Sequence, residues 1–247
     1  MNKFLHDPSR YSHYRPLYPK KIFEYLSSIS YEKNLAIDCG AGSGQATQGL
    51  SWYFKKVIAI DLSKELLLKA PPLPNTIYIQ ASCEKMPVDS NSVDLICVSQ
   101  AVHWFPLNEF YDEVKRILKQ NGIIAVWGYN QATIEPSIDS VIHKIYQKIS
   151  SLQNISIERQ YLYEQYQNMP FPFNRLKTPI FQIEMNWNLI QLLGYISTWP
   201  GLLEYEKKFG INLLNEFNEE FYSNWKDPYL SKPIIWPIFI LLGHADS

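Results

Sequence analysis

Short apolar runs alternate with helical patterns through the first half of the chain. Five such runs predict strands, over residues 35–39, 57–60, 77–79, 93–98 and 123–127. Nearly every position in them is apolar, which is typical of strands buried on both faces of a parallel sheet. Helices are expected between the strands. One covers residues 44–54, and a second begins after an N-cap at Ser63. A third has an apolar face from Phe110 to Leu118 and ends at Asn121-Gly122. The alternation predicts a doubly wound α/β fold with helices on both faces of the sheet.

The pattern changes after Tyr129, where the chain becomes rich in aromatic residues. Helices are expected over residues 138–149, 189–199 and 213–225, and strands over 181–187 and 234–242. Pro237 has no N–H to donate, so we expect the last strand to place it at an edge or a bulge. The aromatic stretch Tyr161–Phe173 is broken by Pro170 and Pro172. It is either a substrate lid or only a hydrophobic cover for helices.

The most informative motif is Asp38-Cys39-Gly40-Ala41-Gly42-Ser43-Gly44. The chain has ten glycines, and three of them fall within five positions that follow a predicted strand and open a predicted helix. Glycine permits positive φ and lets the backbone approach a ligand closely. The spacing is GxGxG, which differs from the GxGxxG of dinucleotide-binding loops, and no Gly-Lys-Ser/Thr is present. The motif indicates a ligand-binding turn; the alternative is a tight turn that binds nothing.

Asp61 closes the second predicted strand, 21 residues after Gly40. A carboxylate at this place can accept hydrogen bonds from both hydroxyls of a ribose. The alternative is an exposed acid that caps the next helix. Together, the glycine motif and Asp61 indicate a nucleoside-containing cofactor, bound beyond the carboxyl ends of the strands.

Composition and charge exclude several classes of protein. Of 247 residues, 46% are hydrophobic and 19% are charged, and the net charge is −1. These values exclude a disordered chain, a collagen and a coiled coil, and they argue against a dedicated nucleic-acid binder. The three cysteines, Cys39, Cys83 and Cys97, form no CxxC pair, so no disulfide framework is expected. No metal site is expected either, because no paired cysteines accompany the histidines His6, His13, His143 and His244, which show no metal-ligand spacing.

Neither a secretion signal nor a membrane span is expected. Residues 1–10 have no apolar segment of the kind that a signal peptide needs. The longest apolar run, residues 234–242, is far shorter than the ~20 residues of a spanning helix. We therefore expect a cytoplasmic protein.

The motifs together resemble those of class I S-adenosylmethionine (AdoMet) methyltransferases. The resemblance is carried by residues 38–44, Asp61, residues 81–87 and residues 92–96. Three further segments resemble those of the trans-aconitate methyltransferase-like subfamily, namely Tyr11–Pro19, Gln100–Phe105 and Tyr195–Trp199. The similarity is specific over residues 11–129 and patchy beyond. One departure is Thr198-Trp199-Pro200, where the subfamily has Thr-Trp-Ser.

The resemblance implies a Rossmann-like, seven-stranded sheet of order 3-2-1-4-5-7-6 with the last strand antiparallel, and a helical, aromatic-rich C-terminal cap. It implies one methyltransferase domain over residues 1–247. The parts of that domain are an N-terminal arm and helix (1–34), a cofactor-binding core (35–129), cap insertions mixed with late sheet elements (130–232) and a last strand (233–247).

The resemblance also implies a cofactor site. Asp61 would bind the ribose hydroxyls of AdoMet, and Leu62 would pack on its adenine. Many relatives have Asp at the position of Ser82, so here the adenine contact would pass to the backbone of Ser82 and Cys83 or to Glu84. The expected cofactor-binding residues are Tyr11, Arg15, Asp38, Gly40, Ala41, Gly42, Gly44, Asp61, Leu62, Ser82, Cys83, Glu84, Ser99 and Gln100.

His103 and Trp104 are the candidate catalytic residues. His103 follows the fourth strand, at the expected ligand edge, where it would position the methyl acceptor or take a proton from it. A carboxylate acceptor would need no base. The alternatives are a histidine held in a structural hydrogen bond and a tryptophan that belongs to the core.

The leading interpretation is an AdoMet-dependent methyltransferase that acts on a small molecule, and the subfamily suggests a carboxylate oxygen of a small organic acid. A non-catalytic AdoMet-binding module or partner subunit, and a nicotinamide-dependent oxidoreductase, are the alternatives. Base-methylating relatives carry Asn-Pro-Pro-Tyr after the fourth strand, whereas this chain has Ser99-Gln100-Ala101-Val102. The expected partner is a small-molecule acceptor rather than nucleic acid or membrane, and the expected assembly is a monomer or weak dimer.

Overall fold

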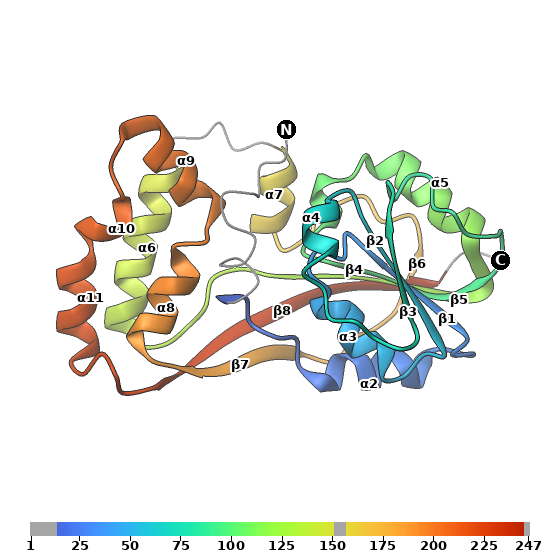
Figure 1. The fold of residues 1–247 in the computed structure, drawn as a ribbon, viewed down its shortest axis with the longest axis horizontal. Coiled ribbons are helices and arrows are strands. Elements are labelled where there is room, and N and C mark those ends of the chain that lie inside the picture. Colours follow the sequence, from blue (N-terminus) through green and yellow to red (C-terminus); the bar gives the residue numbers. More distant parts are fainter. Residues whose placement is uncertain (1–13, 151–156, 245–247) are drawn as a thin grey trace. The chain divides into compact units, whose positions relative to one another are not determined.

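One mixed sheet organises the computed structural model, which describes residues 14–150 and 157–244. Within these residues the sheet has eight strands in the order β3-β2-β1-β4-β5-β8-β6, and β7 pairs with β8 beside this path (Figure 1). The strands are β1 (Leu35–Cys39), β2 (Lys56–Asp61), β3 (Thr76–Gln80), β4 (Val93–Ser99), β5 (Leu118–Tyr129), β6 (Asn174–Arg175), β7 (Phe181–Trp187) and β8 (Lys232–His244). The first five pair in parallel, and β8 runs antiparallel to β5.

The predicted order is confirmed, with one correction to the number of strands. The described residues form eight strands rather than seven because two strands, β6 and β7, both pair with β8, where one was expected. The short strand β6 was not predicted, since two residues carry no periodic pattern. Pro237 lies just before Ile238, the first residue of β8 that pairs with β5, so its missing N–H breaks no bond in that ladder.

Helices cover both faces of the parallel part of the sheet. Figure 1 shows α2 and α3 on the opposite face from α5. Their bounds are α2 (Lys20–Ile29), α3 (Gln45–Ser51), α4 (Lys64–Leu67) and α5 (Leu107–Ile117). Side chains alternate along a strand. Therefore β1 sends Ile37 and Cys39 into the core beneath α5, and it sends Asp38 toward α3, where the Thr47 hydroxyl donates to it.

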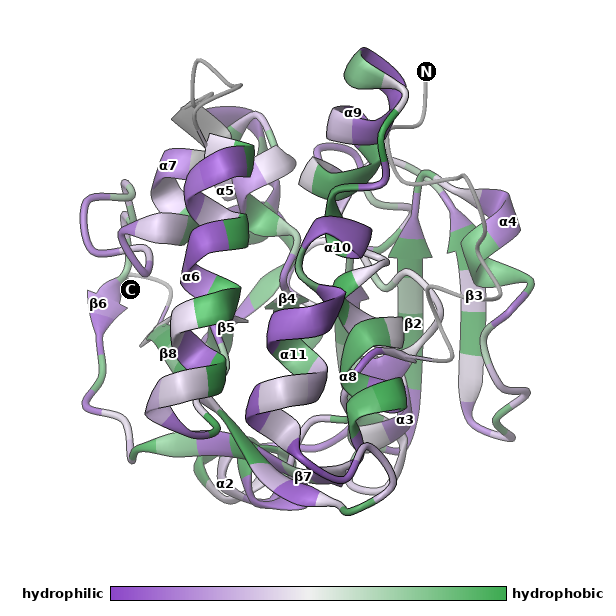
Figure 2. Cartoon of the chain, turned by 90° about the vertical axis from the view of Figure 1, so that its left-hand side faces the viewer, coloured by the Kyte–Doolittle hydropathy of each residue, from purple (hydrophilic) through white to green (hydrophobic). Residues whose placement is uncertain are grey.

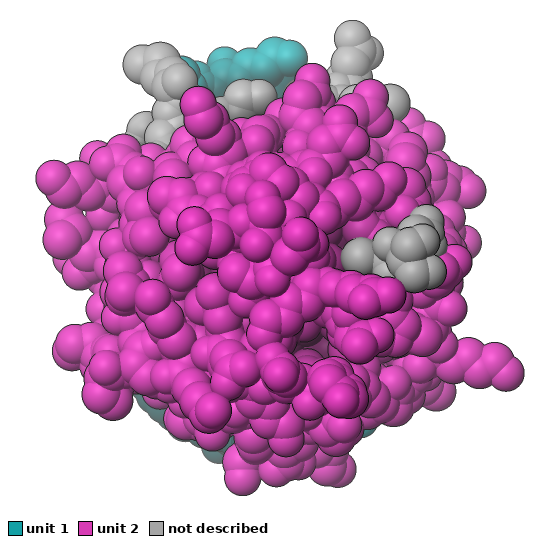
Figure 3. All heavy atoms as spheres, turned by 90° about the vertical axis from the view of Figure 1, so that its right-hand side faces the viewer, with its two compact units in different colours: residues 1–16, 131–157, 182–237 teal, residues 17–130, 158–181, 238–247 magenta. Residues whose placement is uncertain are grey.

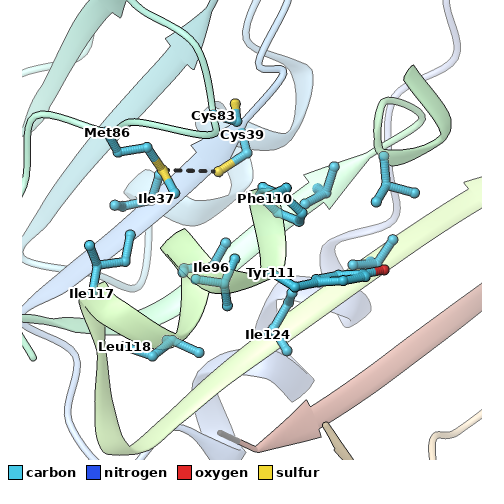
Figure 4. Packing of buried hydrophobic residues seen from close by; sticks show 14 of the residues in the cluster. Ile37, Cys39, Cys83, Met86, Ile96, Phe110, Tyr111, Ile117, Leu118 and Ile124 are labelled. Carbon is cyan, nitrogen blue, oxygen red and sulfur yellow. Dashed lines mark hydrogen bonds between the residues drawn. The ribbon is translucent and has the colours of Figure 1, made fainter. Parts of the chain in front are cut away.

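A large apolar cluster lies between the sheet and α5 (Figure 4). Phe110 and Ile117 of α5 lie in it with Ile96 of β4 and Ile124 of β5. All four side chains are fully buried, and this removal of apolar surface from water is the main force that stabilises the layer. β1 and β4 are buried on both faces, as their apolar runs predicted, whereas β3 at the edge of the sheet is only partly buried.

The boundary between α5 and β5 differs from the prediction. The helix ends at Ile117 and Leu118 already begins β5, so Asn121-Gly122 lies inside a strand. The register between β4 and β5 shifts near Val93, and a Cβ on Gly122 would lie 3.0 Å from the Val93 carbonyl oxygen. Gly122 has no side chain, so it permits the Val93 backbone to approach closely at this irregularity. The predicted helix end was wrong because the Asn-Gly dipeptide is also common at helix ends.

The chain forms two compact units, which Figure 3 colours separately. Unit 2 contains the parallel strands and comprises residues 17–130, 158–181 and 238–244 of the described chain; unit 1 comprises residues 14–16, 131–150, 157 and 182–237. The domain boundaries that the resemblance implies stay a prediction.

Unit 1 is mainly helical. Its helices are α6 (Pro136–Ser150), α8 (Leu189–Ile196), α9 (Pro200–Phe209), α10 (Leu213–Glu216) and α11 (Asn218–Trp225), while α7 (Ile157–Tyr163) falls almost wholly in unit 2. Hydrophobic and hydrophilic bands alternate along α6 and α11 (Figure 2). The predicted helix over 213–225 is divided at Phe217, and the one over 189–199 ends at Ile196. Pro200 occupies the first turn of α9, where a missing N–H costs nothing, so the departure from Thr-Trp-Ser suits a helix start.

Gly49→Ala is expected to destabilise unit 2. A Cβ on Gly49 would lie 2.2 Å from the Phe23 ring, and that ring is buried with its edge against Trp127. The overlap should lower the free energy of unfolding by about 1–3 kcal/mol. Urea unfolding measures it, with Gln48→Ala on the same helix as a control that stays within about 0.5 kcal/mol of wild type. A Gly49→Ala protein as stable as wild type would show that this packing is not as described.

Candidate cofactor and active site

The turn between β1 and α3 places three glycines in the left-handed region. Gly40, Gly42 and Gly44 have φ angles of +69°, +56° and +85°. A Cβ on Gly40 would lie 2.5 Å from the Cβ of Ala101, whereas nothing lies within 4 Å of the place that a Cβ on Gly42 would take. Packing within the protein therefore requires glycine at position 40, while the backbone at Gly42 is open to a ligand.

Asp61 lies at the end of β2, beside this turn. Its Oδ2 accepts a hydrogen bond from the N–H of Gly42 at 2.8 Å, and its Oδ1 accepts one from the N–H of Ser63 at 2.8 Å. A carboxylate has about four lone-pair sites, so two remain. The carboxylate is held in a fixed orientation and can still accept two hydroxyls. The next residue, Leu62, exposes 69% of its surface.

Asp38 is a buried acid with an oxygen that lacks a partner. Its Oδ2 accepts from the Thr47 hydroxyl at 2.5 Å, while its Oδ1 has no hydrogen-bond partner among the described residues. Burial raises the pKa of Asp38 to about 7, and the charge of Asp61 adds to the rise. Because a buried polar atom without a partner is costly, Oδ1 indicates a place for a donor or a cation.

The loop after β3 lies at the same edge of the sheet. Cys83 is buried in it, and Ser82 and Glu84 are partly buried. Glu113 of α5 braces the loop, because its Oε1 accepts from the N–H of Met86 at 2.6 Å. Asp61 and the loop residues 82–84 therefore lie at the ends of adjacent strands, β2 and β3.

A strained residue follows β4. Gln100 has a φ of +55°, which is uncommon for a residue other than glycine. Its N–H donates to the carbonyl of Trp127, and its side-chain amide donates to the carbonyl of Tyr129. These bonds tie the segment after Ser99 to the end of β5. Strain of this kind is often found beside functional sites.

His103 lies in the short helix η1 (Val102–Trp104) that follows. Its ring is 5% exposed, lies 5.0 Å from the Trp104 ring, and has Nδ1 3.0 Å from the Tyr166 hydroxyl. Sequence reasoning missed Tyr166 as a partner and included it only in the aromatic stretch 161–173. No local pattern could reveal a contact between residues 63 positions apart in the chain.

Two predicted cofactor residues do not belong to the described part of unit 2. Tyr11 lies outside the described residues. Arg15 belongs to unit 1, where its guanidinium carbon lies 5.5 Å from the centre of the Tyr195 ring. Their roles stay predictions, as do the cofactor contacts of the other residues.

Two further features are absent from the residues that the structure describes. No cluster of three or more His, Cys, Asp or Glu side chains in this part of the chain could hold a metal ion. No helix in the same residues is both long and apolar enough to cross a membrane.

Comparison with known proteins now adds to this geometry. Residues 37–126 match the family described as "Methyltransferase domain". A Dictyostelium discoideum protein named "putative methyltransferase" is 33% identical over 251 residues, which cover 99% of this chain and 95% of that protein. The chain belongs to the class I AdoMet-dependent methyltransferases. It is therefore an enzyme of this family, with AdoMet as its cofactor, and the alternatives of a nicotinamide-dependent oxidoreductase and a non-catalytic module are set aside.

Two more proteins resemble this methyltransferase over most of its length. One is a solved structure from Anaeromyxobacter dehalogenans, titled as a "putative type II methyltransferase", with a TM-score of 0.88 and 30% sequence identity. The match covers 94% of this chain and 98% of the Anaeromyxobacter chain. A Marinomonas protein named malonyl-[acyl-carrier protein] O-methyltransferase is 29% identical over 201 residues, which cover 72% of this chain and 74% of that protein.

Asp38→Asn is expected to change how stability depends on pH in the methyltransferase without cofactor. The folded protein holds the Asp38 proton up to about pH 7, whereas an unfolded chain loses it near pH 3.8. The folded state binds more protons in this window, so the Asp38 contribution to stability falls as pH rises through it. Asparagine has no such proton to lose. Relative to wild type, the variant should gain up to about 4 kcal/mol between pH 4 and pH 8.

Urea unfolding at a series of pH values measures this difference. Asp112→Asn, which changes an exposed acid in the same way, is the control for the substitution itself. A difference between Asp38→Asn and wild type that does not vary with pH would contradict the raised pKa.

Proposed function

We propose that this methyltransferase transfers the methyl group of AdoMet to a carboxylate oxygen of a small organic acid. The Marinomonas relative is named for O-methylation. Segments around Tyr11, His103 and Trp199 resemble those of the trans-aconitate methyltransferase-like subfamily. A net charge of −1 gives no basic excess for nucleic acid, so the proposed partner is a small molecule.

Three features of unit 2 fit AdoMet, and their combination supports the proposal that this unit binds the methyl donor. Asp38 Oδ1, which has no hydrogen-bond partner among the described residues, would hold the α-ammonium group. The open backbone at Gly42 would let the cofactor approach the turn. The two remaining lone pairs of Asp61 would accept the ribose hydroxyls, and the exposed Leu62 would pack on adenine, beside the loop residues Ser82–Glu84.

When bound, AdoMet supplies a methyl group that its positive sulfur already activates. The residues of the chain need only hold the acceptor in line with that methyl group, exclude water and stabilise the cationic donor. His103 and Trp104 follow the end of β4 and are proposed to position the acceptor, and the ring face of Trp104 suits a cation. A carboxylate that takes the methyl group becomes an ester and releases no proton.

Asp61→Ala is expected to weaken AdoMet binding. Loss of two hydrogen bonds to a ribose should cost about 1–3 kcal/mol, or about 5- to 150-fold in Kd. Isothermal titration calorimetry measures the change, with Asp112→Ala as the control for the loss of one acidic charge. Equal affinities of Asp61→Ala and wild type would remove Asp61 from the cofactor site.

An acceptor screen tests the function itself. Di- and tricarboxylic acids are incubated with AdoMet, alongside alcohols, amines and thiols of the same carbon skeletons, and release of S-adenosylhomocysteine is followed. We expect release with the acids and a product that mild alkali hydrolyses, as it does an ester. Release only with the other acceptors, or a product stable to alkali, would contradict a carboxylate acceptor.

A further inference from the structure

Tyr166 is buried in an unusual way. Gln165 and Tyr166 follow the end of α7 with φ angles of +53° and +61°, two consecutive left-handed residues of which neither is glycine. The N–H of Tyr166 donates to the carbonyl of Tyr161 at 2.8 Å and fixes this turn. The turn directs the tyrosine ring into the core, where none of its surface is exposed and its edge packs on Phe239.

The hydroxyl of Tyr166 has one hydrogen-bond partner in the described structure, Nδ1 of His103, at 3.0 Å. A phenylalanine would fill the same space without taking a hydroxyl out of water. The buried hydroxyl is therefore explained by what it does for His103. Burial also raises the pKa of Tyr166 well above its usual value, so the hydroxyl keeps its proton.

The direction of this hydrogen bond follows from the burial of both groups. If Nδ1 of His103 carried a proton, it would donate to the tyrosine oxygen, and the O–H of Tyr166 would be left buried without an acceptor. If Nδ1 is the acceptor, the O–H is satisfied. The second arrangement is favoured. Neutral His103 then carries its single proton on Nε2.

We propose that Tyr166 is a positioning residue that holds His103 as a neutral donor through Nε2, and that the methyl acceptor is therefore an anionic oxygen. This inference rests on the proposed function of the site. In this state the unprotonated nitrogen of His103 is Nδ1, and its lone pair accepts the hydrogen bond from Tyr166. His103 donates a hydrogen bond to the acceptor and does not remove a proton from it.

The consequence for the acceptor is chemical. A hydroxyl, ammonium or thiol group must lose a proton when it takes a methyl group, so each needs a base. A carboxylate has two oxygens: one accepts the Nε2–H hydrogen bond, and the other forms the new O–CH3 bond as the S–CH3 bond breaks and its electron pair stays on sulfur. No proton is transferred, so the donor state of His103 suits a carboxylate.

Nitrogen NMR of the full chain with ¹⁵N-labelled histidine rings tests the tautomer directly, because protonated and unprotonated ring nitrogens differ widely in chemical shift. Comparison with His103→Gln assigns the signal among the five histidines. We expect wild type to show the proton on Nε2. Tyr166→Phe, which removes only the hydroxyl, should give a mixture of tautomers.

Tyr111→Phe is the matched control. Tyr111 lies in the same apolar cluster, and burial raises the pKa of its hydroxyl too, but it donates to the carbonyl of Pro170 instead of to His103. This variant should leave the His103 signals and kcat as in wild type. A change of tautomer in Tyr111→Phe would show that His103 responds to any loss of a buried hydroxyl, which contradicts the specific role of Tyr166.

Steady-state kinetics, with the acid that the enzyme methylates as substrate, give the second readout. Tyr166→Phe should lower kcat by about 10- to 100-fold while the Kd for AdoMet stays within about twofold. His103→Gln, whose amide nitrogen reaches the place of Nε2, should keep at least about tenfold more kcat than His103→Asn, whose amide reaches only the place of Nδ1.

A wild-type His103 protonated on Nδ1 overturns the inference, as does a Tyr166→Phe enzyme with an unchanged tautomer and unchanged kcat. If wild type methylates no acid, the proposed function fails instead. The nitrogen shifts are measured without turnover, so the two failures are distinguishable.

Discussion

The hydrogen bond from the N–H of Gly42 to Asp61 links the two parts of the chain on which the site depends. The glycine turn follows β1 and the acid ends β2, and the parallel pairing of these strands brings their carboxyl ends together. The N–H groups of Gly40 and Ala41 both donate to the carbonyl of Ile60, which fixes the turn against β2. With the turn fixed, the Asp61 carboxylate presents its remaining lone pairs in one orientation, so the proposed ribose would meet an arrangement that needs little ordering on binding.

Asp38 shows how a buried acid can oppose stability. The same strand alternation that buries Ile37 and Cys39 in the core also buries the carboxyl of Asp38, which accepts a hydrogen bond from the Thr47 hydroxyl. The raised pKa measures the cost of ionising it there. The proposed cofactor ammonium would offset this cost, and so the binding of AdoMet and the ionisation of Asp38 would favour each other.

Sequence patterns predicted the elements around the cofactor site because those elements are local. β1 has the expected bounds, Ser63 caps α4, and the glycines of the turn have positive φ. The predicted end of α5 was wrong because Asn121-Gly122 suits both a helix end and a strand irregularity. Only the pairing of β5 with β4 decides between the two. Tyr166 could not be assigned to His103, since the contact depends on two left-handed residues that no residue type signals.

The most direct test of the account is a crystal structure of the chain with S-adenosylhomocysteine bound. The account predicts that both ribose hydroxyls lie within hydrogen-bonding distance of the Asp61 carboxylate while the bond from Gly42 to Asp61 is kept. It also predicts that the amino group of the ligand meets Oδ1 of Asp38, directly or through one water. A nucleoside bound with neither carboxylate facing it would contradict the account.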